Sequence, residues 1–325
     1  MQKVERYIVY GTLIVLFVLA AIVDLTITKG LYEPNNGFGK TFEVIAVFPP
    51  YWLGAFGLSL ISRFHPSKGK KSDRFLFIFF LILAIGLSLY GGYHAAKLLC
   101  RTLCYVPSTG IKLLIGLGLS VLIYPLSVFF AYRVNKGYSR NAFHLGVFVV
   151  AVLACSVIWM EIIKLIWFRP RYRTLDALLQ VGAIDDISAW WLPFYHPQLF
   201  ISFKKYGVGG EYGFTSAQIE QATKILGIGK WGNDEFYSFP SGHTMNALVC
   251  LGAASLGDVF PKLRKKNAGL IIRIAVYAFA LTVGLSRIVR GAHNATDVLG
   301  GMIFSLAIYD LGETFLYRRF LKVYC

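Results

Sequence analysis

Eight long apolar runs dominate the sequence and restrict what the chain can fold into. They cover residues 7–28, 44–62, 75–96, 111–132, 141–163, 241–258, 268–286 and 297–316. A bilayer core needs about 20 apolar residues per helix, so each run can cross with a modest tilt. Hydrophobic residues make up 56% of the chain and charged residues 15%, whereas soluble domains have roughly 45–50% and about 25%. We therefore expect an all-α, polytopic membrane helix bundle of about eight transmembrane helices.

The net charge of +16 is distributed unevenly along the chain. One set of connections holds 17 of the 33 basic residues and only 2 of the 17 acidic ones: 1–6, 63–74, 133–140, 259–267 and 317–325. By the positive-inside rule this set is cytoplasmic. Both termini are therefore expected on the cytoplasmic side of a cell membrane. The other connections, 29–43, 97–110, 164–240 and 287–296, then face the extracytoplasmic side. Because the excess charge indicates topology, we expect a lipid bilayer and no nucleic acid as partner.

The extracytoplasmic connection 164–240 is much longer than the others. Thr215 and Gln218 have the capping-box pattern and Gly227 supplies a stop, which predicts a short surface helix over 216–226. The connection contains an aromatic stretch made up of Trp190, Trp191, Phe194, Tyr195, Phe200, Phe203 and Tyr206. They fit either a belt at headgroup height or a lid over a lipid-binding mouth.

Two cysteines share the outer connection 97–110. Cys100 and Cys104 would be able to pair in an oxidising compartment. Two cysteines four residues apart are also ordinary at the end of a helix. Both interpretations stay open on the sequence.

The first of three polar clusters lies at the outer end of the fifth apolar run. Lys164, Arg169, Arg171 and Arg173 place four cations within ten residues. Arginine binds phosphate oxygens through two parallel hydrogen bonds, and lysine acts as a point charge. Snorkelling cations are the alternative. The outward location, which runs against the sidedness of the other cations, favours a phosphate site.

The second cluster is Ser241, Gly242 and His243 at the start of the sixth run. Ser241 alone would be explained as a helix cap. Gly242, however, lets a ligand approach the backbone, and free N–H groups at a helix N-terminus bind phosphate. His243 would then lie beside the phosphate as an acid or a base.

The third cluster joins the seventh and eighth runs and contains Ser286, Arg287, His293 and Asp297. Residues four apart share a helix face, so Asp297 is expected to accept a hydrogen bond from the His293 imidazole and fix its tautomer. The other ring nitrogen is then free to attack. A zinc site would need a third ligand, and the arginines suit an anion better. We expect neither a metal nor a cofactor.

These clusters resemble, in the same order, the three signature motifs of the type 2 phosphatidic acid phosphatase superfamily. The matching stretches are Lys164-x6-Arg171, Pro240-Ser241-Gly242-His243 and Ser286-Arg287-x5-His293-x3-Asp297. The second and third match every signature position. In the first, Tyr172 follows Arg171 where the family has proline, and Pro170 precedes it; the spacing favours Arg171 over Arg169. The resemblance covers roughly 141–316. It implies a six-helix phosphatase core within 75–325, preceded by a two-helix membrane extension, 1–74.

The resemblance implies a metal-independent lipid phosphatase that forms a phosphohistidine. His293 would be the nucleophile, Asp297 would orient it, and His243 would protonate the leaving oxygen. The phosphoryl oxygens would be held by Lys164, Arg171, Ser241, Gly242 and Arg287, with Arg169 as an additional candidate.

A site at the outer membrane–water interface favours an amphiphile with its phosphate at headgroup depth. The candidates are phosphatidate, phosphatidylglycerol phosphate and undecaprenyl diphosphate, and the basic inner face favours an enzyme of the bacterial cell envelope. Two alternatives remain. A phosphotransferase or non-catalytic relative would share the scaffold, and an anionic-lipid transporter would be expected to place ionisable residues nearer mid-bilayer.

Overall fold

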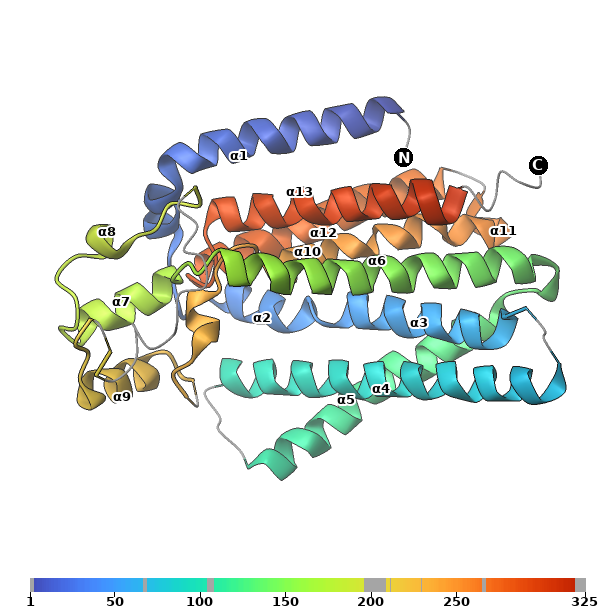
Figure 1. Cartoon of the computed structure of the whole chain (residues 1–325), viewed down its shortest axis with the longest axis horizontal. Helices are drawn as coiled ribbons and strands as arrows, with labels where there is room; N and C mark the ends of the chain where they lie inside the picture. Colours follow the sequence, from blue (N-terminus) through green and yellow to red (C-terminus); the bar gives the residue numbers. More distant parts are fainter. Residues whose placement is uncertain are drawn as a thin grey trace. The chain divides into compact units, whose positions relative to one another are not determined.

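The computed structural model forms helices along most of its length (Figure 1). The residues it describes are 3–66, 69–103, 108–195, 209–210, 212–228, 230–264 and 267–318. Within these ranges, extended pairing is limited to an isolated bridge between Arg169 and Tyr237, and no strand forms. The all-α fold class is confirmed.

Seven helical stretches of the described residues are long and apolar enough to cross a membrane. They are Val4–Leu31, Gly37–Phe64, Lys70–Thr102, Thr109–Arg133, Lys136–Ile166, Ala268–Val289 and Ala295–Arg318. The helices concerned are α1 (Lys3–Leu31), α2 (Gly37–Ile45), α3 (Phe48–Phe64), α4 (Lys70–Thr102), α5 (Thr109–Arg133), α6 (Ser139–Ile166), α12 (Ala268–Val289) and α13 (Ala295–Gly312). The chain has the helices of a multi-pass membrane protein.

The remaining expected crossing, 241–258, is not a single α-helix, so a count of eight is not confirmed. Helix α10 covers Gly242–Val249, and the chain continues as the 3₁₀ helix η4 over Cys250–Asp258. Two glycines and a serine, Gly252, Ser255 and Gly257, lower the α-helix propensity of the second half. Apolar composition alone therefore predicted one regular helix where the chain forms two different ones.

The residues group into two compact units, each described by itself. The first unit contains Met1–Glu43, Ile158–Met245 and Thr282–Phe304. The second contains Val44–Val157, Asn246–Leu281 and Ser305–Cys325. The boundary expected at residue 74 separates a two-helix membrane extension from the phosphatase core. It does not refer to compact units, and it stays a prediction.

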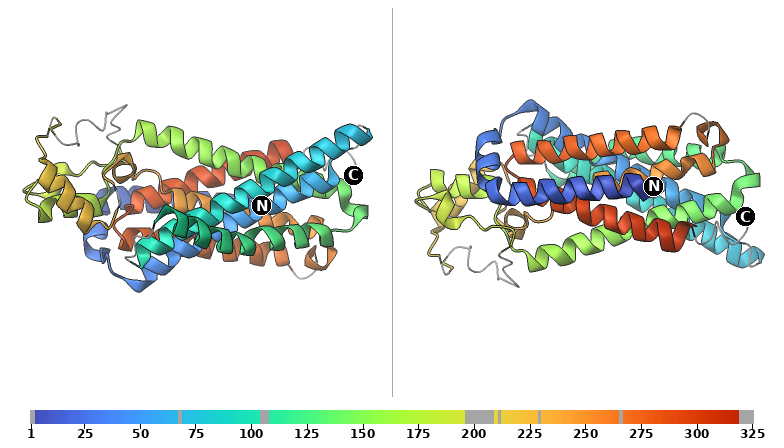
Figure 2. Two further views of the ribbon diagram at one scale, coloured as in Figure 1. Left: turned by 90° about the horizontal axis from the view of Figure 1, so that it is seen from below. Right: turned by 90° about the horizontal axis from the view of Figure 1, so that it is seen from above.

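Helices α3, α4 and α5 pack against one another in the second unit (Figure 2). Glycines permit the closest approach: a Cβ built on Gly92 of α4 would lie 2.2 Å from the carbonyl oxygen of Gly116 in α5. Contact through small residues is typical of helices in membranes, where the backbones gain dispersion energy by close packing.

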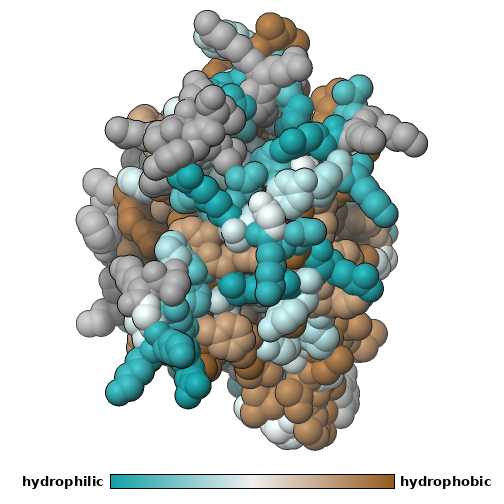
Figure 3. Space-filling model, turned by 90° about the vertical axis from the view of Figure 1, so that its right-hand side faces the viewer, coloured by the Kyte–Doolittle hydropathy of each residue, from teal (hydrophilic) through white to brown (hydrophobic). Residues whose placement is uncertain are grey.

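Several of the basic connections meet at one end of the second unit. The Arg63 guanidinium donates to the Ala131 carbonyl at 3.0 Å, which joins the ends of α3 and α5. Asp258 accepts hydrogen bonds from the Tyr317 hydroxyl at 2.7 Å and, through its carbonyl, from Asn141 at 3.3 Å. Figure 3 shows hydrophilic side chains gathered in the middle of this face and apolar ones near its border. Its assignment to the cytoplasm stays a prediction.

The long connection 164–240 forms a small helical layer in the first unit. Helices α7 (Tyr172–Gln180), α8 (Ile187–Trp190) and α9 (Ser216–Ile225), with η3 (Asn233–Phe236), enclose an apolar core around Leu175, Leu178 and Phe236. The reciprocal capping box of Thr215 and Gln218 opens α9, so the expected surface helix is confirmed.

Other expectations for the outer connections stay open. Phe200, Phe203 and Tyr206 lie outside the described residues, so the belt and the lid both remain interpretations of the aromatic stretch. Cys100 is buried, and Cys104 lies outside the described residues, so their pairing also stays a prediction.

Candidate active site

Backbone pairing holds the first motif against the residues that lead into the second. The Ser238 N–H donates to the Arg169 carbonyl, and the Arg171 N–H donates to the Glu235 carbonyl, both at 3.0 Å. Residues 235–238 directly precede the turn into α10. The connection between α6 and α7 is thereby fixed beside the start of α10.

His293 lies in the connection between α12 and α13, with 2% of its surface exposed. Its Nδ1 is 2.6 Å from the carbonyl oxygen of Ser238. Because a carbonyl oxygen can only accept, Nδ1 carries the proton, and Nε2 of the neutral ring carries the lone pair. Nε2 is therefore the nitrogen that is able to act as a nucleophile.

Asp297, in the first turn of α13, differs from the sequence expectation. Its Oδ2 lies 3.9 Å from His293 Nδ1, which is too far for a hydrogen bond. The same oxygen accepts from the Ser238 hydroxyl and, at 2.7 Å, from the Asn294 N–H. These two donors occupy the oxygen that was expected to meet the imidazole. Asp297 instead holds Ser238, and the Ser238 carbonyl accepts the imidazole proton.

The surroundings of His293 favour the neutral ring. Burial lowers the pKa of His293 well below its ordinary value, and the charges of Arg171, Arg287 and His243 lower it further. Neutral imidazole, the form that a nucleophile requires, is therefore the main species at neutral pH. The three charged groups come from all three motifs, which lie within electrostatic reach of one another.

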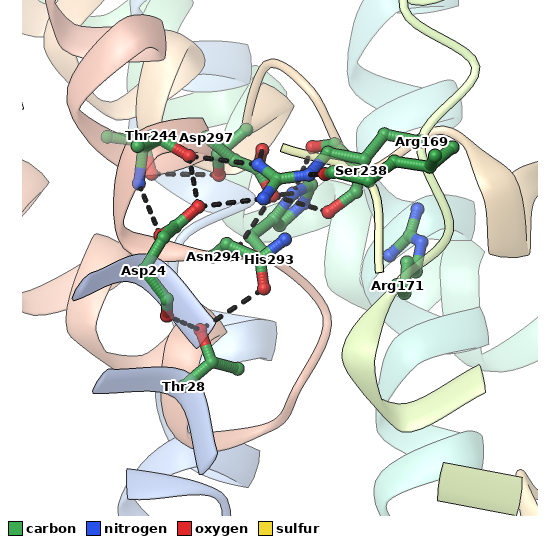
Figure 4. A network of polar contacts seen from close by, with 12 residues as sticks. Asp24, Thr28, Arg169, Arg171, Ser238, Thr244, His293, Asn294 and Asp297 are labelled. Atoms are coloured by element: carbon green, nitrogen blue, oxygen red, sulfur yellow. Dashed lines mark hydrogen bonds and ion pairs between the residues drawn. The ribbon is translucent and has the colours of Figure 1, made fainter. Parts of the chain in front are cut away.

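Arg169 is 2% exposed and lies among acidic and polar groups (Figure 4). Its Nη1 donates to the Asp297 carboxylate at 2.7 Å and to the Thr296 hydroxyl at 2.9 Å. Its Nη2 donates to the Asp24 carboxylate at 2.7 Å, and its Nε donates to the Leu192 carbonyl at 2.6 Å. All three nitrogens are engaged, so a phosphate would have to displace carboxylates that Arg169 already holds.

Arg171 stands apart from this network in Figure 4. Its side chain is only half-buried, and its Nε donates to the Asp234 carbonyl at 2.6 Å. Burial and the nearby charge of Arg173 lower the pKa of Arg171 to about 10, so the group remains a cation at neutral pH. This geometry supports the spacing argument that Arg171, rather than Arg169, meets a phosphate.

Arg287, near the end of α12, is 2% exposed and faces an acid from α2. Its Nη1 lies 2.9 Å from Glu43 Oε1, and Arg290 Nε lies 3.4 Å from Glu43 Oε2. A buried guanidinium is costly without an opposite charge. Glu43 offsets this cost for both arginines and holds Arg287 in one orientation.

The second motif opens α10 next to α13. The Ser241 N–H donates to the Asp297 carbonyl at 2.9 Å, and His243 lies half-buried in the first helical turn. A Cβ built on Gly242 would lie 2.3 Å from Met160 Sδ, so the close packing of α6 on α10 favours glycine here.

Lys164 lies in the last turn of α6 and completes the predicted set. Its Nζ is 3.4 Å from the Glu161 carboxylate, and the group is within electrostatic reach of Arg171.

Within the described part of the chain, no three His, Cys, Asp or Glu side chains are grouped as metal ligands would be. Independence from metal stays a prediction.

The model of the PAP2 superfamily matches residues 145–317, which is more than half of the chain. The chain belongs to the PAP2 superfamily. The three clusters of this PAP2 chain all lie within that match, and the resemblance seen in its motifs is confirmed.

Relatives of this PAP2 chain are named as phosphatases of lipids. Phosphatidylglycerophosphatase B of Bacillus subtilis is 35% identical over 85 residues, covering 26% of this chain and 41% of the relative. Lipid A 1-phosphatase of Rhizobium johnstonii is 34% identical over 88 residues, covering 27% of this chain and 31% of the relative. The chain thus spans less than half the length of the curated relatives it matches. No solved structure matches it.

Sequence reasoning missed two groups that contact the predicted site residues of this PAP2 chain. Asp24 is the only charged residue in the first apolar run, and a lone acid in such a run usually has a partner inside the bundle. That signal was present in the sequence. Ser238 contacts His293 through its backbone carbonyl and Asp297 through its hydroxyl. No sequence pattern indicates either contact.

Two matched substitutions separate the roles of the neighbouring arginines. Arg169→Gln leaves the buried carboxylates of Asp24 and Asp297 without their cation, so it is expected to lower the free energy of unfolding by about 3–5 kcal/mol. Arg171→Gln removes the half-buried candidate phosphate ligand and is expected to lower kcat/KM roughly 10- to 100-fold, with little change in stability. Thermal unfolding in detergent and steady-state kinetics check both. A stable Arg169 variant beside an unfolded Arg171 variant would contradict the assignment.

Proposed function

We propose that the chain is an integral-membrane lipid phosphatase that hydrolyses a lipid phosphate or diphosphate through a phosphohistidine on His293. The observation that carries the proposal is the oriented imidazole, whose Nδ1 is bound to the Ser238 carbonyl at 2.6 Å. The cations of Arg171 and Arg287 lie close enough to act on the same ring, and they suit a phosphate. The names of the relatives support this class of substrate.

In the first step, His293 Nε2 attacks phosphorus and the bond between phosphorus and the lipid oxygen breaks. His243, protonated at the start of the step, gives its proton to that oxygen, and the lipid leaves as an alcohol or, from a diphosphate, as a monophosphate. The new N–P bond places positive charge on the imidazole. The Ser238 carbonyl, held through its hydroxyl by Asp297, stabilises the Nδ1–H of the charged ring.

In the second step, water attacks phosphorus and the N–P bond breaks. His243, now neutral, takes a proton from the water and returns to its starting state. Inorganic phosphate leaves, and His293 regains the lone pair on Nε2. No oxidant, reductant or additional reactant is required.

Positive charge and N–H donors stabilise the phosphoryl group as its bonds change. The proposed ligands of its oxygens are Lys164, Arg171, Ser241, the Gly242 N–H and Arg287. Phosphoryl transfer depends mainly on positioning and on electrostatic stabilisation of the equatorial oxygens. Prearranged cations, such as Arg287 held by Glu43, need little rearrangement when the substrate binds.

The substrate is proposed to be a membrane lipid with its phosphate at the extracytoplasmic surface. The uneven distribution of Lys and Arg motivates this sidedness, with both termini in the cytoplasm. Phosphatidate, phosphatidylglycerol phosphate and undecaprenyl diphosphate all present phosphate at this depth. Recycling of a polyprenyl carrier in a bacterial cell envelope is the specific hypothesis that a lipid panel tests.

The purified protein is expected to release phosphate from at least one of these three lipids, and EDTA is expected to leave the rate unchanged. The reason is that Arg, Lys and N–H groups supply the electrostatic stabilisation a metal would otherwise give. Phosphate release with and without EDTA measures both points. Release from none of the lipids contradicts the phosphatase proposal, and activity that EDTA removes and zinc restores contradicts metal independence. Transfer of labelled phosphate to a second lipid would identify a phosphotransferase instead.

A further inference from the structure

The carboxylate of Asp24, in α1, is part of the polar network around Asp297. It is 5% exposed. Its Oδ2 lies 2.7 Å from Arg169 Nη2 and accepts the Thr296 hydroxyl at 2.5 Å, while its Oδ1 accepts the Thr296 N–H at 3.1 Å. Both oxygens are therefore directed at groups that flank Asp297 (Figure 4).

The next turn of α1 reaches the same region. The hydroxyl of Thr28, which is fully buried, lies 3.1 Å from the Asn294 side-chain oxygen and 3.0 Å from the Asp24 carbonyl, and these two acceptors share its one hydrogen. Asn294 follows His293 directly in the chain, and its N–H donates to Asp297. One face of α1 thus contacts the loop that carries the proposed nucleophile.

Asp24 and Asp297 share one guanidinium. Arg169 donates to Asp24 from Nη2 and to Asp297 from Nη1, both at 2.7 Å. The three groups together carry one net negative charge. Without Asp24, Arg169 would neutralise Asp297 alone, and the network would lose the negative charge that favours a cationic imidazole at His293.

We propose that Asp24 is a positioning residue of the active site, which fixes Arg169 and Thr296 and through them the Asp297 carboxylate. This inference rests on the proposed phosphatase function. Helix α1 lies outside the residues matched by the PAP2 superfamily, 145–317. The proposed role of Asp24 thus makes α1 a structural support of the active site, in addition to being a membrane helix.

The effect is expected in turnover rather than in substrate binding. Asp24 contacts Arg169 and Thr296, and neither is proposed to bind phosphate. The attack of His293 on phosphorus creates positive charge on the ring, which the network of Asp24, Arg169 and Asp297 stabilises. We therefore expect Asp24→Asn to lower kcat about 10- to 100-fold while KM changes less than about 3-fold.

The experiment compares three variants of the full-length protein, purified in detergent, on the best lipid of the panel. Asp24→Asn keeps the shape of the side chain and removes its charge. Thr26→Val, an exposed position on the same helix, is the matched control and is expected to keep the parental kcat. Thr296→Val removes the hydroxyl that joins Asp24 to Arg169 and is expected to lower kcat about 3- to 10-fold, with KM unchanged.

A double-substitution cycle tests the route of the effect. If Asp24 acts through Asp297, Asp24→Asn is expected to reduce kcat less than 3-fold in an Asp297→Asn background. An equal reduction in both backgrounds would overturn the proposed route through Asp297.

The single variants test the inference by itself. A folded Asp24→Asn protein with the parental kcat would overturn the inference alone. If that variant fails to fold, parental kcat in Thr296→Val would overturn it. An inactive parental protein on every lipid would overturn the phosphatase proposal, and the inference with it.

Discussion

Replacement of His293 by alanine is expected to abolish phosphate release while the protein still folds and inserts into the membrane. The imidazole Nε2 is the proposed nucleophile, and its loss removes the covalent route. We expect kcat to fall on the order of 10⁴-fold or more. Phosphate release by the purified variant, normalised to the amount of folded protein, measures the effect.

His144→Ala is the matched control for this substitution. His144 is a half-buried histidine of α6 in the second unit, and it belongs to none of the three motifs. Its variant is expected to keep the parental rate. A His293→Ala protein that hydrolysed the lipid at near the parental rate would refute the assignment of the nucleophile.

His243→Gln is expected to have the second largest effect, and its size should depend on the leaving group. An alkoxide leaves slowly unless it is protonated, so loss of the general acid should lower kcat by about 10²- to 10⁴-fold on a lipid phosphomonoester. A nitrophenolate leaves readily without a proton. On nitrophenyl phosphate the same variant should therefore lose much less activity.

Paired kinetics with the two substrates separate acid catalysis from binding. If His243 only helped to hold the phosphate, both substrates would lose the same factor. Equal losses would therefore contradict the proposed proton transfer. Ser241→Ala provides a comparison at a neighbouring position, because a lost phosphate ligand should affect both substrates alike.

The three motifs predicted which segments meet at the candidate site, because each motif is a short pattern at the end of an apolar run. The backbone then brings them together: the Arg169–Ser238 pairing joins the first motif to the approach of the second, and the Ser241 N–H bonds the Asp297 carbonyl of the third. Local spacing predicted which residues belong to the candidate site. It also favoured Arg171 over Arg169 as the phosphate candidate; this stays a prediction, and the structure shows Arg169 bound to other partners.

Contacts between distant parts of the chain were beyond sequence patterns. Asp24 meets Arg169 across 145 positions, and Arg287 meets Glu43 from another helix. Helical periodicity relates residues a few positions apart, so it predicted an Asp297–His293 hydrogen bond. The bond is not made because the carboxylate oxygen is occupied by Ser238, which the fold brings in from 59 positions away, and by the neighbouring Asn294 N–H.

The expected count of eight crossings is not confirmed, for a related reason. Hydropathy counts apolar residues, but it does not register how glycines change the helix type. The run 241–258 is apolar throughout, yet it changes from α10 to η4 at Cys250. The other seven runs lie in helical stretches long and apolar enough to cross a membrane, and these stretches were predicted from hydropathy alone.

Trapping of the covalent intermediate tests the central claim most directly. The protein is mixed with a lipid phosphate that carries radioactive phosphorus, and the reaction is stopped in alkali within the first turnover. We predict labelled protein whose label survives alkali and is lost in acid, as expected for phosphohistidine, together with an unlabelled His293→Ala variant. An unlabelled parental protein that still releases phosphate, or a labelled His293→Ala variant, would contradict the account.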